Sequence, residues 1–102
     1  MQFDVHRNGV DSSRYAPFLL DIQADLLEDL ATRIVVPLIL MPLFGRRAGR
    51  LHPILAIDNQ QVVMATHLVA AIRRGELGVP VASLRDQRDE IIRAIDILLA
   101  GV

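Results

Sequence analysis

Apolar and polar residues alternate near the start of the chain with the period of a half-buried β-strand. Gln2 to His6 alternates in this way, and Tyr15 to Gln23 resumes the pattern. Between them, the pair Asn8-Gly9 is a turn signal, and the polar run Asp11 to Ser13 extends the loop. The two segments therefore predict an antiparallel hairpin.

The middle of the chain is more apolar. Arg33 to Met41 is rich in β-branched and aliphatic residues, which predicts a central strand. Since proline cannot donate to a ladder, we expect a bulge or an edge position at Pro37. Asp25 to Thr32 favours a helix locally but fits a loop with one helical turn equally well. Shorter strands are expected at Pro53 to Ile57, Gln60 to Thr66 and Val79 to Ala82.

The last segment, Ser83 to Val102, reads as one helix with Ser83 as its N-cap, bonded to the backbone N–H of Asp86. Its apolar stripe comprises Leu84, Ile91, Ile92, Ile95, Leu98 and Leu99. A stripe of this kind must dock on a core. The whole pattern predicts one α+β domain over residues 1–102, a mostly antiparallel β-sheet closed by a C-terminal helix.

Composition narrows the class of protein. An apolar fraction of 52% against 23% charged residues excludes a disordered chain, and a net charge of −1 provides no whole-chain attraction to nucleic acid or anionic lipid. The run Ile34 to Phe44 is too short to cross a membrane and holds two prolines. Because Met1 to Arg7 also lacks the apolar core of a signal peptide, we expect a cytoplasmic protein with no membrane contact.

Residues suited to catalysis or metal binding are scattered. His6, His52 and His67 are expected to be isolated and lack a second ligand at helical spacing, which argues against a metal site. The serines are explained as turn residues and a helix cap, and no cysteine is present. The carboxylates of Asp21, Asp25, Glu28 and Asp29 could hold a cation or act as acid and base, but a solvated loop explains them better. We therefore expect that the protein binds no cofactor and is not an enzyme.

The loop Gly45 to Leu51 carries Arg46, Arg47 and Arg50. Three guanidinium groups in one loop are suited to a phosphate or an acidic peptide. Since no aromatic residues are interleaved with them, solvation or protein contact explains them at least as well as nucleic acid. From its residues alone, the chain is a small α+β domain with a binding role.

Several pieces of the chain, in the same order and over nearly its whole length, resemble the CcdB toxins, the gyrase poisons of bacterial toxin–antitoxin modules. These pieces are Met1 to Val5, Ser13 to Tyr15, Leu20 to Leu27, Arg33 to Leu38, Leu51 to Leu55, and Asp89 to Leu99 with Gly101 and Val102. The resemblance implies a homodimer whose main antiparallel sheet packs on the C-terminal helix, with a smaller sheet to one side.

The resemblance also implies two contact surfaces. The paired C-terminal ends would bind the DNA gyrase A subunit and trap the cleaved gyrase–DNA complex, with Phe3 supporting the contact. The positions expected at gyrase are Ala24, Leu26, Leu27, Asp96, Ala100, Gly101 and Val102. A cognate CcdA-like antitoxin would wrap a groove containing Ser12, Ser13, Arg14, Pro42, Leu43, Arg46, Arg47 and Arg50. The toxin–antitoxin complex would repress its own operon, with DNA bound only through the antitoxin.

One departure from the family bears on activity. The toxin motif ends in Trp-Gly-Ile, whereas this chain ends Ala100-Gly101-Val102, and Asp96 replaces an asparagine. Aromatic anchors often supply about 2 kcal/mol or more of interface energy. Two alternatives to a gyrase poison therefore stay open: a relative that only binds antitoxin, and a ribonuclease toxin of the same architecture, against which the balanced charge argues.

Overall fold

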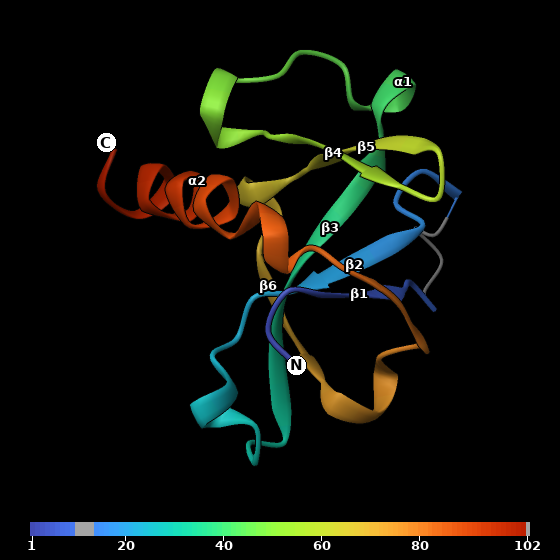
Figure 1. The fold of residues 1–102 in the computed structure, drawn as a ribbon, viewed down its shortest axis with the longest axis vertical. Coiled ribbons are helices and arrows are strands. Elements are labelled where there is room, and N and C mark those ends of the chain that lie inside the picture. The colour runs from blue at the N-terminus through green and yellow to red at the C-terminus, as the bar shows by residue number, and fades with distance from the viewer. Residues whose placement is uncertain (10–13, 102) are drawn as a thin grey trace.

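Seven strands form one curled, antiparallel sheet in the computed structural model, which describes residues 1–9 and 14–101 (Figure 1). They are β1 (Asp4–Arg7), β2 (Phe18–Asp21), β3 (Thr32–Leu40), β4 (Ile54–Ile57), β5 (Gln60–Met64), β6 (Ala70–Arg73) and β7 (Pro80–Ser83). Their order is β4-β5-β3-β2-β1-β7, and β6 pairs with β3. With the C-terminal helix, this confirms the predicted α+β class.

The two predicted hairpins are confirmed. β1 pairs antiparallel with β2, placing Val5 opposite Leu20, although the predicted loop Asp11 to Ser13 lies outside the described residues. β4 pairs with β5 through a two-residue turn in which Asp58 and Asn59 have φ of 48° and 67°. Both values are left-handed, as a type I′ turn requires, and asparagine and aspartate tolerate that region better than other residues with side chains.

The prediction of a bulge or an edge position at Pro37 is wrong. β3 is the central strand, and Pro37 pairs with Leu19 of β2. On its other side β3 changes partner, from β6 up to Val35 to β5 from Leu38. The Pro37 carbonyl accepts from the Ala65 N–H on that side, and in an antiparallel strand the N and C=O of one residue point the same way. The proline nitrogen therefore faces the gap between β6 and β5, where no ladder donor is needed.

The predicted start of the C-terminal helix is also wrong. α2 spans Arg88–Ala100 and follows the single turn η6 (Arg85–Gln87). Ser83 is the last residue of β7, opposite Asp4, and its hydroxyl accepts from the Arg85 N–H at 3.3 Å. The Ser83 side chain is suited to a helix cap, but its backbone pairs with β1 in the sheet. The helix therefore begins only at Arg88.

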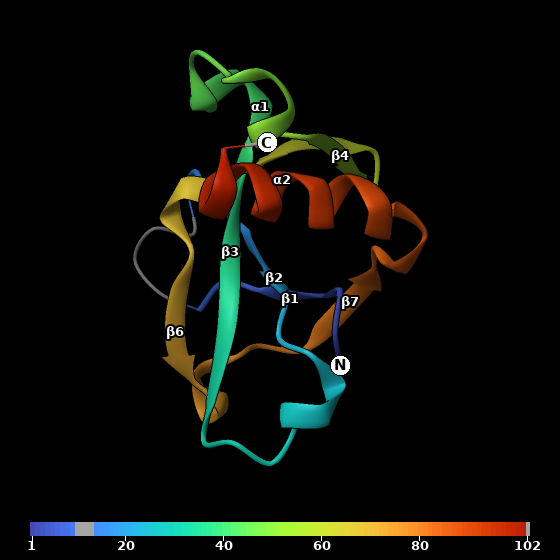
Figure 2. The ribbon, with the colours of Figure 1, turned by 90° about the vertical axis from the view of Figure 1, so that its left-hand side faces the viewer.

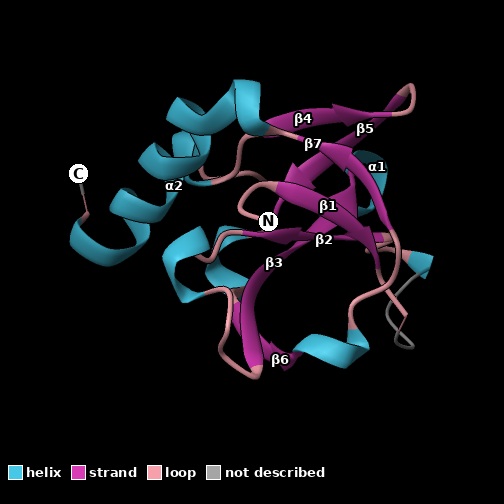
Figure 3. Cartoon of the chain, turned by 60° about the horizontal axis from the view of Figure 1, so that its bottom comes forward, coloured by secondary structure: helices cyan, strands magenta, loops and turns pink. Residues whose placement is uncertain are grey.

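The apolar stripe of α2 covers one side of the curled sheet (Figures 2 and 3). Ile91 and Ala94 are fully buried, and they pack in one core with Val5, Leu20 and Val36. The other helical turns are short: η2 (Asp25–Leu27), α1 (Met41–Phe44), η3 (Gly49–Leu51), η4 (Thr66–Leu68) and η5 (Arg74–Glu76). In the described part of the chain, no helix has the length and apolar character to cross a membrane.

Candidate partner-binding surfaces

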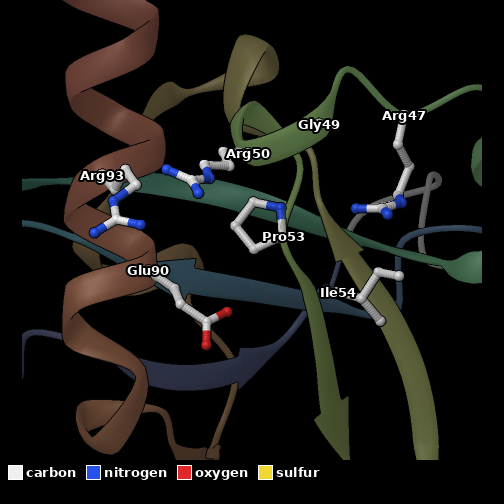
Figure 4. A pocket seen from close by; sticks show the side chains of 7 residues that line it. All are labelled: Arg47, Gly49, Arg50, Pro53, Ile54, Glu90 and Arg93. Carbon is white, nitrogen blue, oxygen red and sulfur yellow. The ribbon is translucent and has the colours of Figure 1, made fainter. Parts of the chain in front are cut away.

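A cleft of about 400 Å³ lies between η3 and the first half of α2 (Figure 4). Its lining residues are Arg47, Gly49, Arg50, Pro53, Ile54, Glu90 and Arg93. Arg50 comes from η3 and Arg93 from α2, so two elements far apart in sequence supply the cations. The sequence suggested only the loop arginines; Arg93 joins them because α2 packs against η3.

The cleft continues along α2 into a second hollow. That hollow is lined by Arg50, Arg88, Asp89, Ile92, Arg93, Asp96 and Ile97. Arg50 and Arg93 border both spaces, which makes one groove, called the arginine groove below. Among the described residues, neither of these two side chains makes an ion pair, and both are exposed. Their charge is therefore available to an acidic partner, although Glu90, Asp89 and Asp96 reduce the net potential.

The two loops expected to form the antitoxin contact are close together at their described ends. The Leu40 N–H donates to the Tyr15 carbonyl at 2.7 Å, which holds the start of α1 beside the segment that follows Arg14. Pro42 and Leu43 of α1 are exposed, and so are Arg14 and Arg46. Ser12 and Ser13 lie outside the described residues.

The expectation that the histidines are isolated is wrong for two of them. The His52 Nε2 lies 2.9 Å from the His67 Nδ1, and the Ala48 N–H donates to the His52 Nδ1 at 2.8 Å. The Phe44 ring packs edge-on against His52, with ring centroids 4.8 Å apart. Burial lowers the pKa of His52, and the charges of His67 and Arg47 lower it further. The third histidine, His6, donates from Nδ1 to the Gly78 carbonyl at 2.9 Å.

The solvated loop expected for the acidic cluster is wrong for Asp21. Its side chain is 1% exposed and accepts from Nη2 and Nε of Arg33, which is 2% exposed, at 2.7 and 3.1 Å. Arg33 also donates to Glu28 at 3.0 Å. Burial alone would lower the pKa of Arg33, but the hydrogen bonds and charges of Asp21 and Glu28 outweigh it and raise that pKa above its ordinary value. The pair is a structural ion pair inside the fold.

This ion pair supports the loop that carries three of the residues expected to contact gyrase, which are Ala24, Leu26 and Leu27. Gln23 is buried, accepts from the Ile34 N–H at 3.0 Å and donates to the Leu27 carbonyl at 2.9 Å. Ala24 is exposed, and Leu26 is 95% exposed at the surface of η2. Buried polar residues therefore hold an exposed apolar tip in place.

The C-terminal end of α2 is a second exposed apolar tip. Leu99 is 78% exposed, and Ala100 and Gly101 are exposed, whereas Val102 lies outside the described residues. Gly101 caps the helix at φ 76°, with its N–H donating to the Ile97 carbonyl at 2.8 Å. Phe3, expected to support the gyrase contact, is a buried core residue.

The two tips do not adjoin within one chain. Figures 1 and 2 both place the C-terminal end of α2 in the upper half of the molecule and η2 near its lower end. Asp96 is exposed in the arginine groove, on α2. The residues expected at gyrase therefore form two separate patches on the protomer.

A further apolar surface runs from η4 onto the edge of the sheet. Leu68 and Val69 are exposed, and Ala70 and Ala71 of β6 are exposed as well. In the described structure β6 pairs only with β3, so its outer edge is open, and η4 packs against α2. Open apolar edges are sites where proteins pair with another chain.

The chain matches the CcdB protein family over residues 2–101. An endoribonuclease in complex with its cognate antitoxin, from a mycobacterial species, is similar in structure with a TM-score of 0.77 and 14% identity, over 97% of this chain and 93% of that one.

A second similar structure is the Mycobacterium tuberculosis toxin MazF-mt6, with a TM-score of 0.75 and 18% identity, over 94% of this chain and 95% of that one. At these identities the two structures show a shared fold. Because the family match covers nearly every residue, the chain belongs to the CcdB protein family and has the fold of toxins from toxin–antitoxin modules.

Proposed function

We propose that this protein is a toxin that acts by binding: it engages the gyrase A subunit through its C-terminal end and is neutralised by the acidic segment of a cognate antitoxin. The observation that carries the proposal is the family match over residues 2–101, together with an exposed C-terminal end. The apolar side chains of Leu99 and Ala100 are exposed beside the Gly101 cap, so that end is free to contact a partner.

The test is a cleavage assay with purified gyrase and supercoiled DNA. A poison is expected to leave linear DNA after denaturation of the complex, at a concentration similar to that of gyrase. A chain that binds antitoxin tightly but leaves no linear DNA would be the non-poisoning relative that Ala100 suggests. Cleavage of RNA by the purified chain, with gyrase intact, would contradict the proposal.

The arginine groove is the proposed binding site of the antitoxin. We expect the variant in which Arg50 and Arg93 of the groove and Arg46 of the neighbouring loop are all replaced by alanine to bind antitoxin about 3- to 150-fold more weakly at low salt, since each exposed charge pair contributes about 0.2–1 kcal/mol. The remaining binding should depend less on salt. Arg47 is kept because its guanidinium donates to the His52 carbonyl at 2.8 Å and so supports the loop. Calorimetric titration at several salt concentrations measures both effects.

A matched control removes three exposed arginines elsewhere. Its substitutions are Arg7→Ala, Arg74→Ala and Arg85→Ala. The control and the groove variant lose the same number of positive charges. Their long-range attraction to an acidic partner is therefore equal, and the two variants differ only in whether the groove arginines are present. Equal losses of affinity in the two variants would show that the groove has no specific role.

We further propose that the apolar surface of β6, η4 and the end of α2 is covered by a second copy of the chain. We expect a homodimer at micromolar concentration, and Leu68→Glu should shift it to monomer because it buries a charge in the interface. Light scattering after size exclusion measures the mass. Val79→Glu, at another exposed apolar residue, is the control and should stay dimeric. A monomeric native chain would refute this surface as the interface.

A further inference from the structure

The histidine pair has one definite neutral arrangement. Because the Ala48 N–H donates to the Nδ1 of His52, at 2.8 Å, that nitrogen must be an acceptor without a proton. The proton of the neutral ring is then on Nε2, which lies 2.9 Å from the Nδ1 of His67 and donates to it. The His52 ring thus links the loop that carries Arg46 and Arg47 to η4.

A second proton on His52 would break the link to the loop. It would be added at Nδ1, directly facing the Ala48 N–H, so two donors would point at each other. The ring is only 6% exposed, and a charged imidazolium there would lose most of its hydration. The described groups facing it include no anion: they are His67 from η4, the ring of Phe44 from α1, and Arg47 from the loop. In the described part of the chain, neither ring forms an ion pair with a carboxylate.

The loop segment tied by this bond is flanked by two glycines. Arg46, Arg47 and Ala48 are exposed and lie between Gly45 and Gly49, which have φ of 82° and 53°. Glycine enters this left-handed region without the strain that other residues incur, so it can change conformation at low cost. Beyond Gly49 the chain is held independently, because the Thr66 hydroxyl donates to the Leu51 carbonyl at 2.6 Å.

We infer that His52 and His67 form a pH-sensitive latch, which holds the Arg46–Ala48 segment closed when His52 is neutral and releases it when His52 is protonated. The consequence for binding rests on the proposed function: a released segment must be ordered again before its arginines can hold the antitoxin, so acid weakens that complex. Ordering such side chains on binding carries an entropic cost.

The direction of the pH effect follows from linkage. Burial, then His67 and Arg47, lower the pKa of His52 in the closed state below the ordinary value of about 6.5. The open state therefore binds the proton more readily. The closed loop has its full stability above about pH 6.5 and loses it as the pH falls toward the lowered pKa.

The test follows amide exchange of the free protein by NMR. Between pH 7.5 and 5, the protection factor of the Ala48 amide is expected to fall at least tenfold, while that of Ile91 in the core stays constant. His52→Asn is the matched variant, because its side-chain oxygen can replace Nδ1 as an acceptor but does not titrate. In that variant the Ala48 amide should keep its protection. An Ala48 protection factor that is equally independent of pH in the native protein would overturn the latch.

A second measurement separates the latch from the antitoxin site. Antitoxin affinity is measured at pH 7.5 and 5.5 for the native chain and for His52→Asn. The native chain is expected to lose at least tenfold more affinity than the variant. If the Ala48 amide opens in acid but both chains lose affinity equally, the latch stands, and the assignment of the antitoxin to the arginine groove is overturned.

Discussion

Replacement of Arg33 by methionine is expected to lower the free energy of unfolding by about 3–5 kcal/mol. The substitution removes the partner of Asp21, whose carboxylate is 1% exposed, and leaves a buried charge. The N-terminal ammonium, 3.5 Å from Asp21, is itself mostly exposed and compensates only in part. For a domain of this size the loss corresponds to a decrease in melting temperature of roughly 10 °C or more, measured by calorimetry.

Two further variants test the cause. Arg74→Met removes an exposed arginine that donates to the Glu28 carbonyl and whose nearest Glu28 carboxylate oxygen lies at 3.9 Å, and it should change stability by less than about 1 kcal/mol. Asp21→Asn combined with Arg33→Met removes both buried charges and keeps an acceptor for the Gln23 N–H, so it should recover much of the loss. A single Arg33→Met variant as stable as the native chain would contradict a structural role for the pair.

Replacement of Ala100 by tryptophan is expected to raise gyrase-linked DNA cleavage about 30-fold or more with a gyrase that recognises the family's aromatic residue. Ala100 is exposed and lies between Leu99, which is 78% exposed, and the Gly101 cap. An indole at this position enters solvent without overpacking the core, so the fold should be unchanged. The cleavage assay described for the proposed function measures the gain.

The control adds the same side chain elsewhere. Gln60→Trp places an exposed indole on β5, across the molecule from the C-terminal end (Figure 1), and should leave cleavage unchanged. A folded, dimeric Ala100→Trp protein with no gain would refute the anchor argument and direct attention to Asp96. A native chain that already poisons this gyrase fully would also refute it, and Leu26, Leu27 and Val102 would then carry the contact.

Short-range patterns in the sequence were sufficient for much of the fold. Alternation predicted the hairpin of β1 and β2, and the Asp58-Asn59 turn predicted the pairing of β4 with β5. The helical spacing of Ile91, Ile95 and Leu98 predicted a docked C-terminal helix. These features depend on residues close together in the chain, whose period and turn chemistry are local properties. The family resemblance, confirmed over residues 2–101, was also carried by local motifs.

Tertiary structure decided the features that depend on which segments meet. The sequence does not show that Asp21 and Arg33 face each other inside the fold, or that His52 and His67 form one pair. Ser83 has the side chain of a helix cap, yet in the sheet it is the last residue of a strand. Pro37 is a residue typical of edge strands, yet it lies in the central strand where that strand changes its neighbour. Likewise, Arg93 joins the loop arginines only because α2 packs on η3. In each case the role of a polar group is set by the hydrogen-bond partners and the burial that distant segments provide, and neither is encoded in the spacing of neighbouring residues.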